Sequence, residues 1–187
     1  MKNLLNFFTI CLTSCILLSG CASNVNKIIS KRLDTELMHS KLETKKTDLS
    51  ADSKCSVAKS LNVINGESRT DKYCIDEFMG CRMHIIPKDF TNEIVTYIEK
   101  RLAESNIRVG SSNDIIVSLE ELKSQEGVWT FGSSCKIKVN IPEINYTQTY
   151  IGESGSPLGD YAAAYAIHLA VENFFKDTVF QNYLKCQ

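Results

Sequence analysis

Apolar and polar side chains alternate between residues 114 and 154 with the two-residue period of β-strands. In SCKIKVNIP (134–142) one parity is apolar and the other polar: Ile137, Val139 and Ile141 against Lys136, Lys138 and Asn140. DIIVSLEEL (114–122) and EINYTQTYIGES (143–154) are the strand candidates on either side, and Pro142 to Asn145 can turn the chain between strands. The alternation predicts a sheet with one covered face and one face in water.

Two segments instead repeat their apolar residues with the period of a helix. The first follows Pro87, and its apolar positions recur every four residues: Phe90, Ile94, Ile98 and Leu102. The second is expected over about residues 157–183, after a loop over 152–160 and with Pro157 as a first helical residue. Its expected apolar face is Ala164, Ile167, Val171, Phe174 and Val179.

A further strand candidate, SVAKSLNVINGES (56–68), ends at the turn signal Asn65-Gly66, and IRV (107–109) is a brief strand-like segment after the first helix. The main order of elements is therefore β-α-β-β-β-α. This order predicts an α+β fold, with an antiparallel or mixed sheet and two helices packed on one face.

The first 20 residues have the proportions of a signal peptide. Their apolar stretch, from Leu4 to Leu18, is shorter than the roughly 20 residues of a membrane-spanning helix. Leu18-Ser19-Gly20-Cys21 resembles the lipobox of bacterial lipoproteins, where the cysteine receives diacylglycerol before cleavage on its N-terminal side. The resemblance implies that residues 1–20 are removed and that Cys21 carries diacylglycerol and a further acyl chain such as palmitate. An ordinary signal peptide followed by an unrelated cysteine is the alternative.

Lipidation at Cys21 would hold the chain at a membrane. Each buried methylene contributes about 0.8 kcal/mol, so two or three acyl chains anchor a protein effectively permanently. The next residue is Ala22 and not aspartate. By resemblance to proteobacterial lipoprotein sorting, this implies the outer membrane, with the domain facing the periplasm.

Residues 21–56 are expected to form the lipidated cysteine and a tether, and residues 57–187 a periplasmic α+β domain. The tether candidate has no aromatic residue, and KLETKKTDLSADSK (41–54) is polar and mixed in charge. Some apolar residues fall roughly at helical spacing: Val25, Ile28, Ile29, Leu33, Leu37 and Leu42. A solvated linker is the favoured interpretation. A surface helix, or a helix that docks a partner, is the alternative.

Eight cysteines are present, of which five would remain as thiols after processing and lipidation: Cys55, Cys74, Cys81, Cys135 and Cys186. In an exported protein disulfides are the default. Cys135 has the parity of the covered strand face and is expected to stay buried and unpaired. Cys74 is predicted to bond locally to Cys81, because the short segment between them contains a glycine that lets the chain turn back. Cys55 is predicted to bond to Cys186, because domain termini often lie close together. A Cys81–Cys135 bond is the competing arrangement.

The remaining chemistry argues against several classes of function. The net charge is −1 without a basic patch, which argues against binding of nucleic acid. No G-x-S-x-G, H-E-x-x-H or Gly-rich phosphate motif occurs, so we expect no catalytic residues, no cofactor and no enzymatic activity. Cys74, Cys81 and His84 supply at most three ligands, and a disulfide is favoured over a metal. Four tyrosines either pack or form an aromatic binding surface: Tyr146, Tyr150, Tyr161 and Tyr165.

Several short motifs resemble the YajG family of outer-membrane lipoproteins and, more loosely, the auxiliary lipoproteins of ABC and lipid-transport systems. They are NGESR (65–69), IPKDF (86–90), RLAESNIRVG (101–110), DIIVSLEEL (114–122), Tyr150-Ile151-Gly152 and Asn182-Tyr183-Leu184. The resemblance covers roughly residues 60–185. The extra cysteines and the longer tether depart from the family. The resemblance implies a fold and an address and supplies no biochemical activity.

Two functions fit these observations. The first is a non-catalytic interaction module that binds an envelope protein or another envelope component through its open sheet face or edge. The second is a carrier of a lipid or small ligand in an envelope transport system. An acyl carrier needs an apolar groove, whereas Lys136, Lys138 and Asn140 make the open face polar and favour the first.

Overall fold

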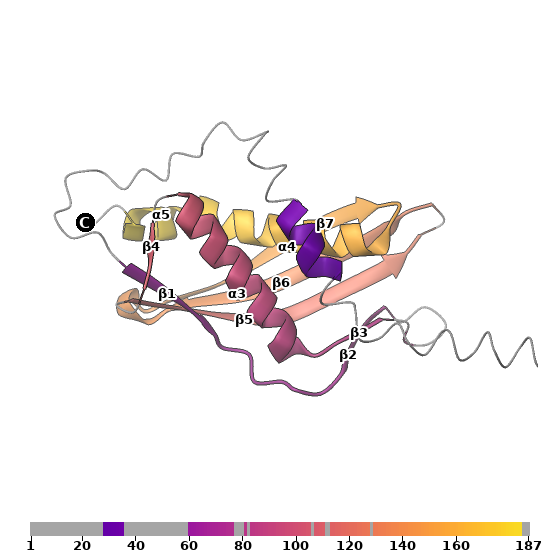
Figure 1. The fold of residues 1–187 in the computed structure, drawn as a ribbon, viewed down its shortest axis with the longest axis horizontal. Helices are drawn as coiled ribbons and strands as arrows, with labels where there is room; N and C mark the ends of the chain where they lie inside the picture. The colour runs from indigo at the N-terminus through magenta and orange to yellow at the C-terminus, as the bar shows by residue number, and fades with distance from the viewer. Residues whose placement is uncertain are drawn as a thin grey trace, which may run out of the picture.

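The computed structural model describes residues 28–35, 60–76, 81, 83–105, 107–110, 113–127 and 129–184. Within these ranges the chain forms a mixed sheet, a short hairpin beside it and helices packed on one face of the sheet (Figure 1). The strands are β1 (Ser60–Asn65), β2 (Tyr73–Asp76), β3 (Met83–Ile85), β4 (Arg108–Val109), β5 (Asn113–Glu126), β6 (Phe131–Ile141) and β7 (Tyr146–Ser156). The labelled helices are α3 (Pro87–Glu104), α4 (Gly159–Lys176) and α5 (Thr178–Leu184).

The main sheet has five strands within the described residues, in the order β4-β1-β5-β6-β7. β1 runs parallel to β4 and β5, whereas β5, β6 and β7 form an antiparallel meander. Val117 lies opposite Val139 and Leu119 opposite Ile137. A bulge between Leu119 and Glu121 shifts the phase of β5, which returns the following leucine to the covered face. The predicted α+β fold with a mixed sheet is confirmed.

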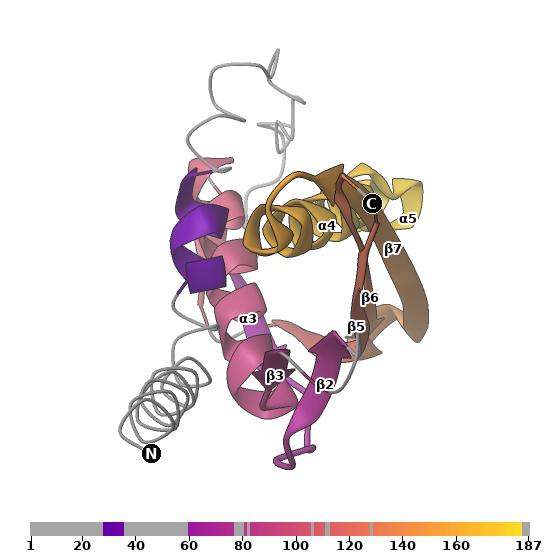
Figure 2. The same cartoon turned by 90° about the vertical axis from the view of Figure 1, so that its right-hand side faces the viewer.

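Two helices cover the same face of this sheet, as the sequence predicted (Figure 2). α3 begins at Pro87, which lacks an amide hydrogen where the first turn needs none, and its four predicted apolar residues are buried. α4 is rich in alanine and lies very close to β7. A Cβ atom at Gly152 would lie 1.9 Å from the carbonyl oxygen of Ala166, so only glycine fits at this crossing.

The opposite face of the sheet carries polar pairs that connect neighbouring strands. Asn62 donates a hydrogen bond to Asp114 over 2.9 Å, and the Nζ of Lys136 lies 2.8 Å from a carboxylate oxygen of Glu121. Lys138 is exposed on the same face. The prediction of one covered and one hydrated face is therefore confirmed.

The prediction of a single second helix is wrong, because α4 and α5 are separate. The interruption is at Asp177, whose backbone is extended. Its carboxylate accepts hydrogen bonds from the amides of Val179 (2.8 Å) and Phe180 (3.1 Å). Asp177 thus ends α4 and caps α5. Val179 was expected in the core but is 40% exposed, because the interruption breaks the helical phase on which that expectation depended.

The start of the second helix also differs from the prediction. β7 continues to Ser156, through residues expected to form a loop, because they stay paired with β6. α4 begins at Gly159, so Pro157 precedes the helix and is not its first residue. The β2–β3 hairpin was predicted only as a turn between Cys74 and Cys81, and its two strands were not predicted.

Residues 28–35 form a helix that packs on the domain, although the sequence placed them in a tether (indigo in Figure 1). Ile29 and Leu33, one turn apart, are 1% and 2% exposed and belong to the hydrophobic core. The Nε of Arg32 lies 3.1 Å from a carboxylate oxygen of Asp160 at the start of α4. The solvated-linker interpretation is wrong for this segment, because two apolar side chains on one helical face suffice to join a core that is already formed.

Candidate functional site

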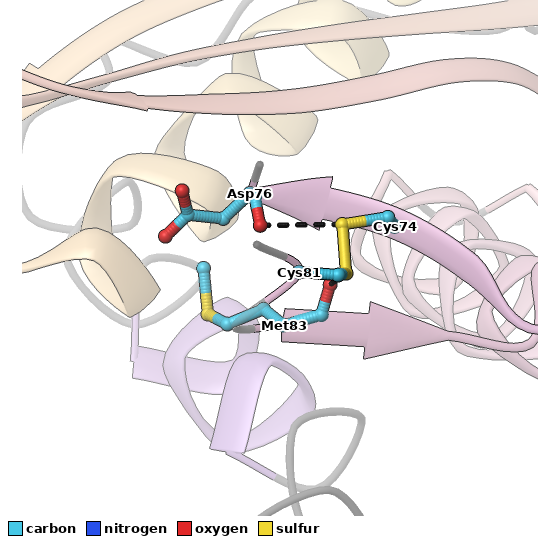
Figure 3. The surroundings of a disulfide bond; sticks show 4 residues. All are labelled: Cys74, Asp76, Cys81 and Met83. Carbon is cyan, nitrogen blue, oxygen red and sulfur yellow. Dashed lines mark hydrogen bonds between the residues drawn. A yellow bond between two sulfur atoms is a disulfide. The ribbon is translucent and has the colours of Figure 1, made fainter. Parts of the chain in front are cut away.

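The β2–β3 hairpin is closed by a disulfide between Cys74 and Cys81 (Figure 3). The Cα atoms of the two cysteines are 5.8 Å apart, within the usual range for such a bond. This is the local pairing expected from the sequence. The Sγ of Cys74 lies 3.2 Å from the carbonyl oxygen of Asp76, and because a disulfide sulfur has no hydrogen to donate, we describe this as a close contact. The bond fixes a hairpin that also contributes Ile75 and Ile85 to the hydrophobic core.

A groove of about 540 Å³ lies between this hairpin and the end of β5. Its lining residues come from two strand segments, Tyr73–Asp76 and 123–126. Asp76 and Ser124 are buried, and Ser124 accepts a hydrogen bond from Ser133 over 3.2 Å. With a lysine and carboxylates also in the lining, the groove suits a polar ligand or a peptide better than an acyl chain.

The loop before the hairpin is held by an ion pair within the NGESR motif. The guanidinium of Arg69 donates to both carboxylate oxygens of Glu67, over 2.9 and 2.7 Å, and also to the carbonyl oxygen of Leu119 on β5. The hydrogen bond from Arg69 lowers the pKa of the Glu67 carboxyl, although burial opposes this shift. The backbone carbonyl of Arg69 accepts from the amide of Lys88 on α3 (3.0 Å). The loop is thereby fixed to β5 and α3, and it positions the hairpin that forms one wall of the groove.

A second polar cluster joins α3 to α4. The hydroxyl of Tyr97 and the Nδ1 of His168 are 2.5 Å apart, and Arg101 pairs with Glu172 one helical turn further along. The ring of Tyr165 stacks on His168, with centroids 5.7 Å apart. Burial, the largest cause, lowers the pKa of His168, so the imidazole is neutral at pH 7. The cluster fastens the two helices together. In the sequence, Tyr97 and Arg101 lie four residues apart, as do His168 and Glu172, but this spacing does not show that the two pairs meet.

The other cysteines are partly placed. Cys135 is a buried free thiol, as its parity predicted, and burial raises its pKa to about 12. Because Cys81 is bonded to Cys74, the competing Cys81–Cys135 bond is excluded. Cys55 and Cys186 lie outside the described residues, so their pairing stays a prediction.

The metal alternative finds no support at the hairpin. The two cysteine sulfur atoms of the hairpin are bonded to each other. His84 lies opposite Cys74 in the β2–β3 register, and neither cysteine is a thiolate that could bind a metal together with it. Across the described part of the chain, no three His, Cys, Asp or Glu side chains gather as metal ligands would.

The four tyrosines fall into three packing sites, because Tyr146 and Tyr150 share one. Tyr146 donates to Asp177 over 2.9 Å and lies 3.1 Å, oxygen to oxygen, from Tyr150, which packs against the aromatic core. The ring of Tyr161 lies under the guanidinium of Arg32, 3.9 Å from its centroid. These contacts favour the packing interpretation over a shared aromatic binding surface.

The expected signal peptide and the lipidation site at Cys21 lie outside the described residues. No helix in the described ranges combines the length and the apolar character needed to cross a membrane. Comparisons with known proteins yield no relative: no protein-family model matches the chain, and neither the curated proteins nor the solved structures contain a match. The resemblance to YajG-like lipoproteins therefore stays a prediction.

Proposed function

We propose that this chain is a lipid-anchored, non-catalytic module of the bacterial envelope, which binds an envelope protein through the open face of its sheet. The anchor is inferred from the Leu18-Ser19-Gly20-Cys21 junction. On the same reasoning, Ala22 supports the outer membrane as the location, with the domain in the periplasm.

The open sheet face is the observation that carries the interaction. It presents charged and hydroxyl side chains in fixed positions, because they are paired across strands. Glu121 lies within ion-pair distance of both Lys123 and Lys136, whose hydrogen bonds lower its pKa. Thr149 on β7 donates to Glu120 over 3.0 Å. Such a charge-paired surface suits the polar surface of another protein better than it suits an acyl chain.

The anchor is tested by replacing Cys21 with serine. Cells that express the wild-type chain or Cys21→Ser are fed a fatty-acid analogue, and label on the protein is measured. Label should be lost in the variant. Equal labelling of both proteins would sink the anchor. Ala22→Asp supplies a separate test of the address, because fractionation should then find the protein in the inner membrane.

The interaction is tested by photo-crosslinking in intact cells. A photoreactive amino acid is placed at Lys138 on the open face, or at Lys176 as the matched exposed lysine at the end of α4. Discrete protein adducts should form from position 138 and disappear when Cys21→Ser misplaces the chain. Adducts from position 176 alone would assign the interaction to the helical side.

A small-ligand carrier is the second candidate, and the groove beside the Cys74–Cys81 disulfide is the observation that favours it. Its polar lining indicates a polar ligand. Native mass spectrometry of the purified chain distinguishes the two functions, because a carrier should retain a bound compound of defined mass that a Ser124→Leu variant loses.

A further inference from the structure

One end of the molecule carries an apolar patch, which we call the end patch: the exposed residues Trp129, Pro157 and Leu158, and the half-buried Phe131. Trp129, at the tip of the β5–β6 hairpin, is 88% exposed, and Leu158, just before α4, is 54% exposed. The ring of Phe131 joins the two segments, because a Cβ atom at Gly159 would lie 3.3 Å from it. Trp129 gains little from burial in the protein, and with Leu158 it forms an exposed apolar surface of the kind that contacts other molecules.

The end patch itself carries no charge, although Glu126 lies opposite Phe131 on β5 and the Arg32–Asp160 ion pair follows the patch. Neither residues 127–132 nor residues 155–159 contain an ionisable side chain. Attraction between charges therefore does not explain this surface. An indole at the boundary between an apolar region and water is the arrangement that tryptophan adopts at membrane interfaces.

The helix over residues 28–35, which follows the proposed anchor in sequence, packs next to the residues that follow the patch. Arg32 binds Asp160 and covers Tyr161, in the first turn of α4, directly after the patch residue Leu158. In Figures 1 and 2 the helix lies against the same half of the molecule as the start of α4. The docked helix thus connects the N-terminal segment to the end that carries the patch.

The length of chain between the anchor and the docked helix is short. Ile28 follows Cys21 by seven residues, and seven residues span at most about 25 Å when fully extended. Whatever conformation that segment adopts, a lipid on Cys21 must lie within this distance of Ile28. A lipid on Cys21 would therefore keep the docked helix, and the start of α4 that it contacts, close to the bilayer.

From these observations we propose that the end patch lies in the lipid interface, with Trp129 at the level of the headgroups. This inference rests on the lipid anchor of the proposed function. It adds that the docked helix and the patch orient the domain, so that the β5–β6 hairpin tip points to the membrane. Because the patch is neutral, the contact should not depend on anionic lipid or weaken with added salt.

Trp129 is the single tryptophan of the chain, so intrinsic fluorescence reports on the patch alone. The lipidated full-length protein is placed in vesicles of phosphatidylethanolamine and phosphatidylglycerol, with or without phosphatidylcholine brominated along its acyl chains. Vesicle flotation reports anchoring, and quenching by bromine reports lipid contact at Trp129. We expect an emission maximum at shorter wavelength than in the unlipidated Cys21→Ser protein, and loss of intensity in the brominated vesicles.

Two exposed apolar residues at opposite ends of the helical layer provide matched variants. Leu158→Glu places a charge in the end patch and should reduce the quenching, whereas Val179→Glu on α5 should leave it unchanged. A chain that does not float refutes the anchor and the orientation with it. A chain that floats but shows unquenched Trp129 emission overturns the orientation alone. An equal response of the two variants also overturns it.

Discussion

Val139→Asp should unfold the domain at neutral pH. Val139 is fully buried at the centre of β6, opposite Val117. Loss of its apolar burial costs about 2 kcal/mol. The introduced carboxyl has no partner in this core and stays protonated, and keeping an acid of pKa about 3.9 neutral at pH 7 costs about 4 kcal/mol more. A typical domain is stable by about 5–15 kcal/mol, so a loss of about 6 kcal/mol removes much or all of it.

The assay is urea unfolding followed by circular dichroism, on chains made without residues 1–20 and with Cys21→Ser. The pKa of the introduced carboxyl is raised in the folded state, so its ionisation cost exists above the unfolded pKa and vanishes below it. The loss of stability should therefore shrink by about 1.4 kcal/mol for each pH unit between 7 and 4. Val139→Asn has nearly the same shape and no charge, and it should show no such dependence on pH.

The matched control is Lys138→Asp, the same change one residue away on the open face. Lys138 is exposed, so the free energy of unfolding should change by less than about 1 kcal/mol. A shift of one residue in register would exchange the two faces. Equal losses in Lys138→Asp and Val139→Asp would therefore refute the assigned register.

Three further predictions concern packing, pH and redox state. Gly152→Ala should destabilise the domain by about 1–3 kcal/mol or more, because β7 meets α4 there. Gly155→Ala is the control and should be nearly neutral in the same urea assay, because its Cβ atom would meet only an ordinary contact at 3.8 Å. Burial lowers the pKa of His168 in the folded state. The contribution of the neutral imidazole to stability should therefore be complete above about pH 6.5 and should fall as the pH drops through the folded pKa. Urea unfolding of His168→Gln should lack this loss of stability at low pH. Peptide mapping without reduction should recover a Cys74–Cys81 pair, and Cys74→Ser should cost about 2 kcal/mol in the chain-entropy picture; recovery of Cys81 as a free thiol would contradict both.

The sheet and α3 could be predicted from sequence because local pattern and tertiary packing agree there. Ile137 and Val139 alternate with lysines, and α3 repeats its apolar residues every four positions after Pro87. Each signal is long enough to fix both the type of element and its buried face. The bulge in β5 was not predicted. Its signal in the sequence is the three-residue step between the buried residues Leu119 and Leu122, where an unbroken strand would have a two-residue step.

The interruption at Asp177 and the strands of the β2–β3 hairpin were missed for different physical reasons. Asp177-Thr178 carries a helix-capping signal, but the apolar residues around it continue the helical spacing and hide the break. The hairpin has no alternating run, and its only local signal is the spacing of Cys74 and Cys81. A covalent bond closes it, and the burial of Ile75 and Ile85 holds it against the core.

Contacts between distant segments could not be predicted from one sequence. Ile29 and Leu33 mark a single helical turn, and nothing local shows that Arg32 will find Asp160, 128 residues further along. The pairing of Tyr97 with His168 likewise depends on how α3 and α4 are placed over the sheet. The groove could not be predicted either, because its two walls come from separate parts of the chain.

The proposed orientation also decides which partners the open sheet face can meet. The strands run along the long axis of the molecule, with the β5–β6 hairpin tip at one end (Figure 1). If this tip lies in the lipid interface, the strands stand away from the membrane, and the open face points sideways, along the plane of the membrane. A flexible tether of about 35 residues would let that face sample all directions, with a typical end-to-end distance of about 30–35 Å. A docked helix restricts it instead to neighbours standing on the same membrane. Crosslinks from position 138 should therefore reach membrane-attached proteins in preference to soluble ones, and this preference should disappear when Leu158→Glu removes the contact of the patch with lipid.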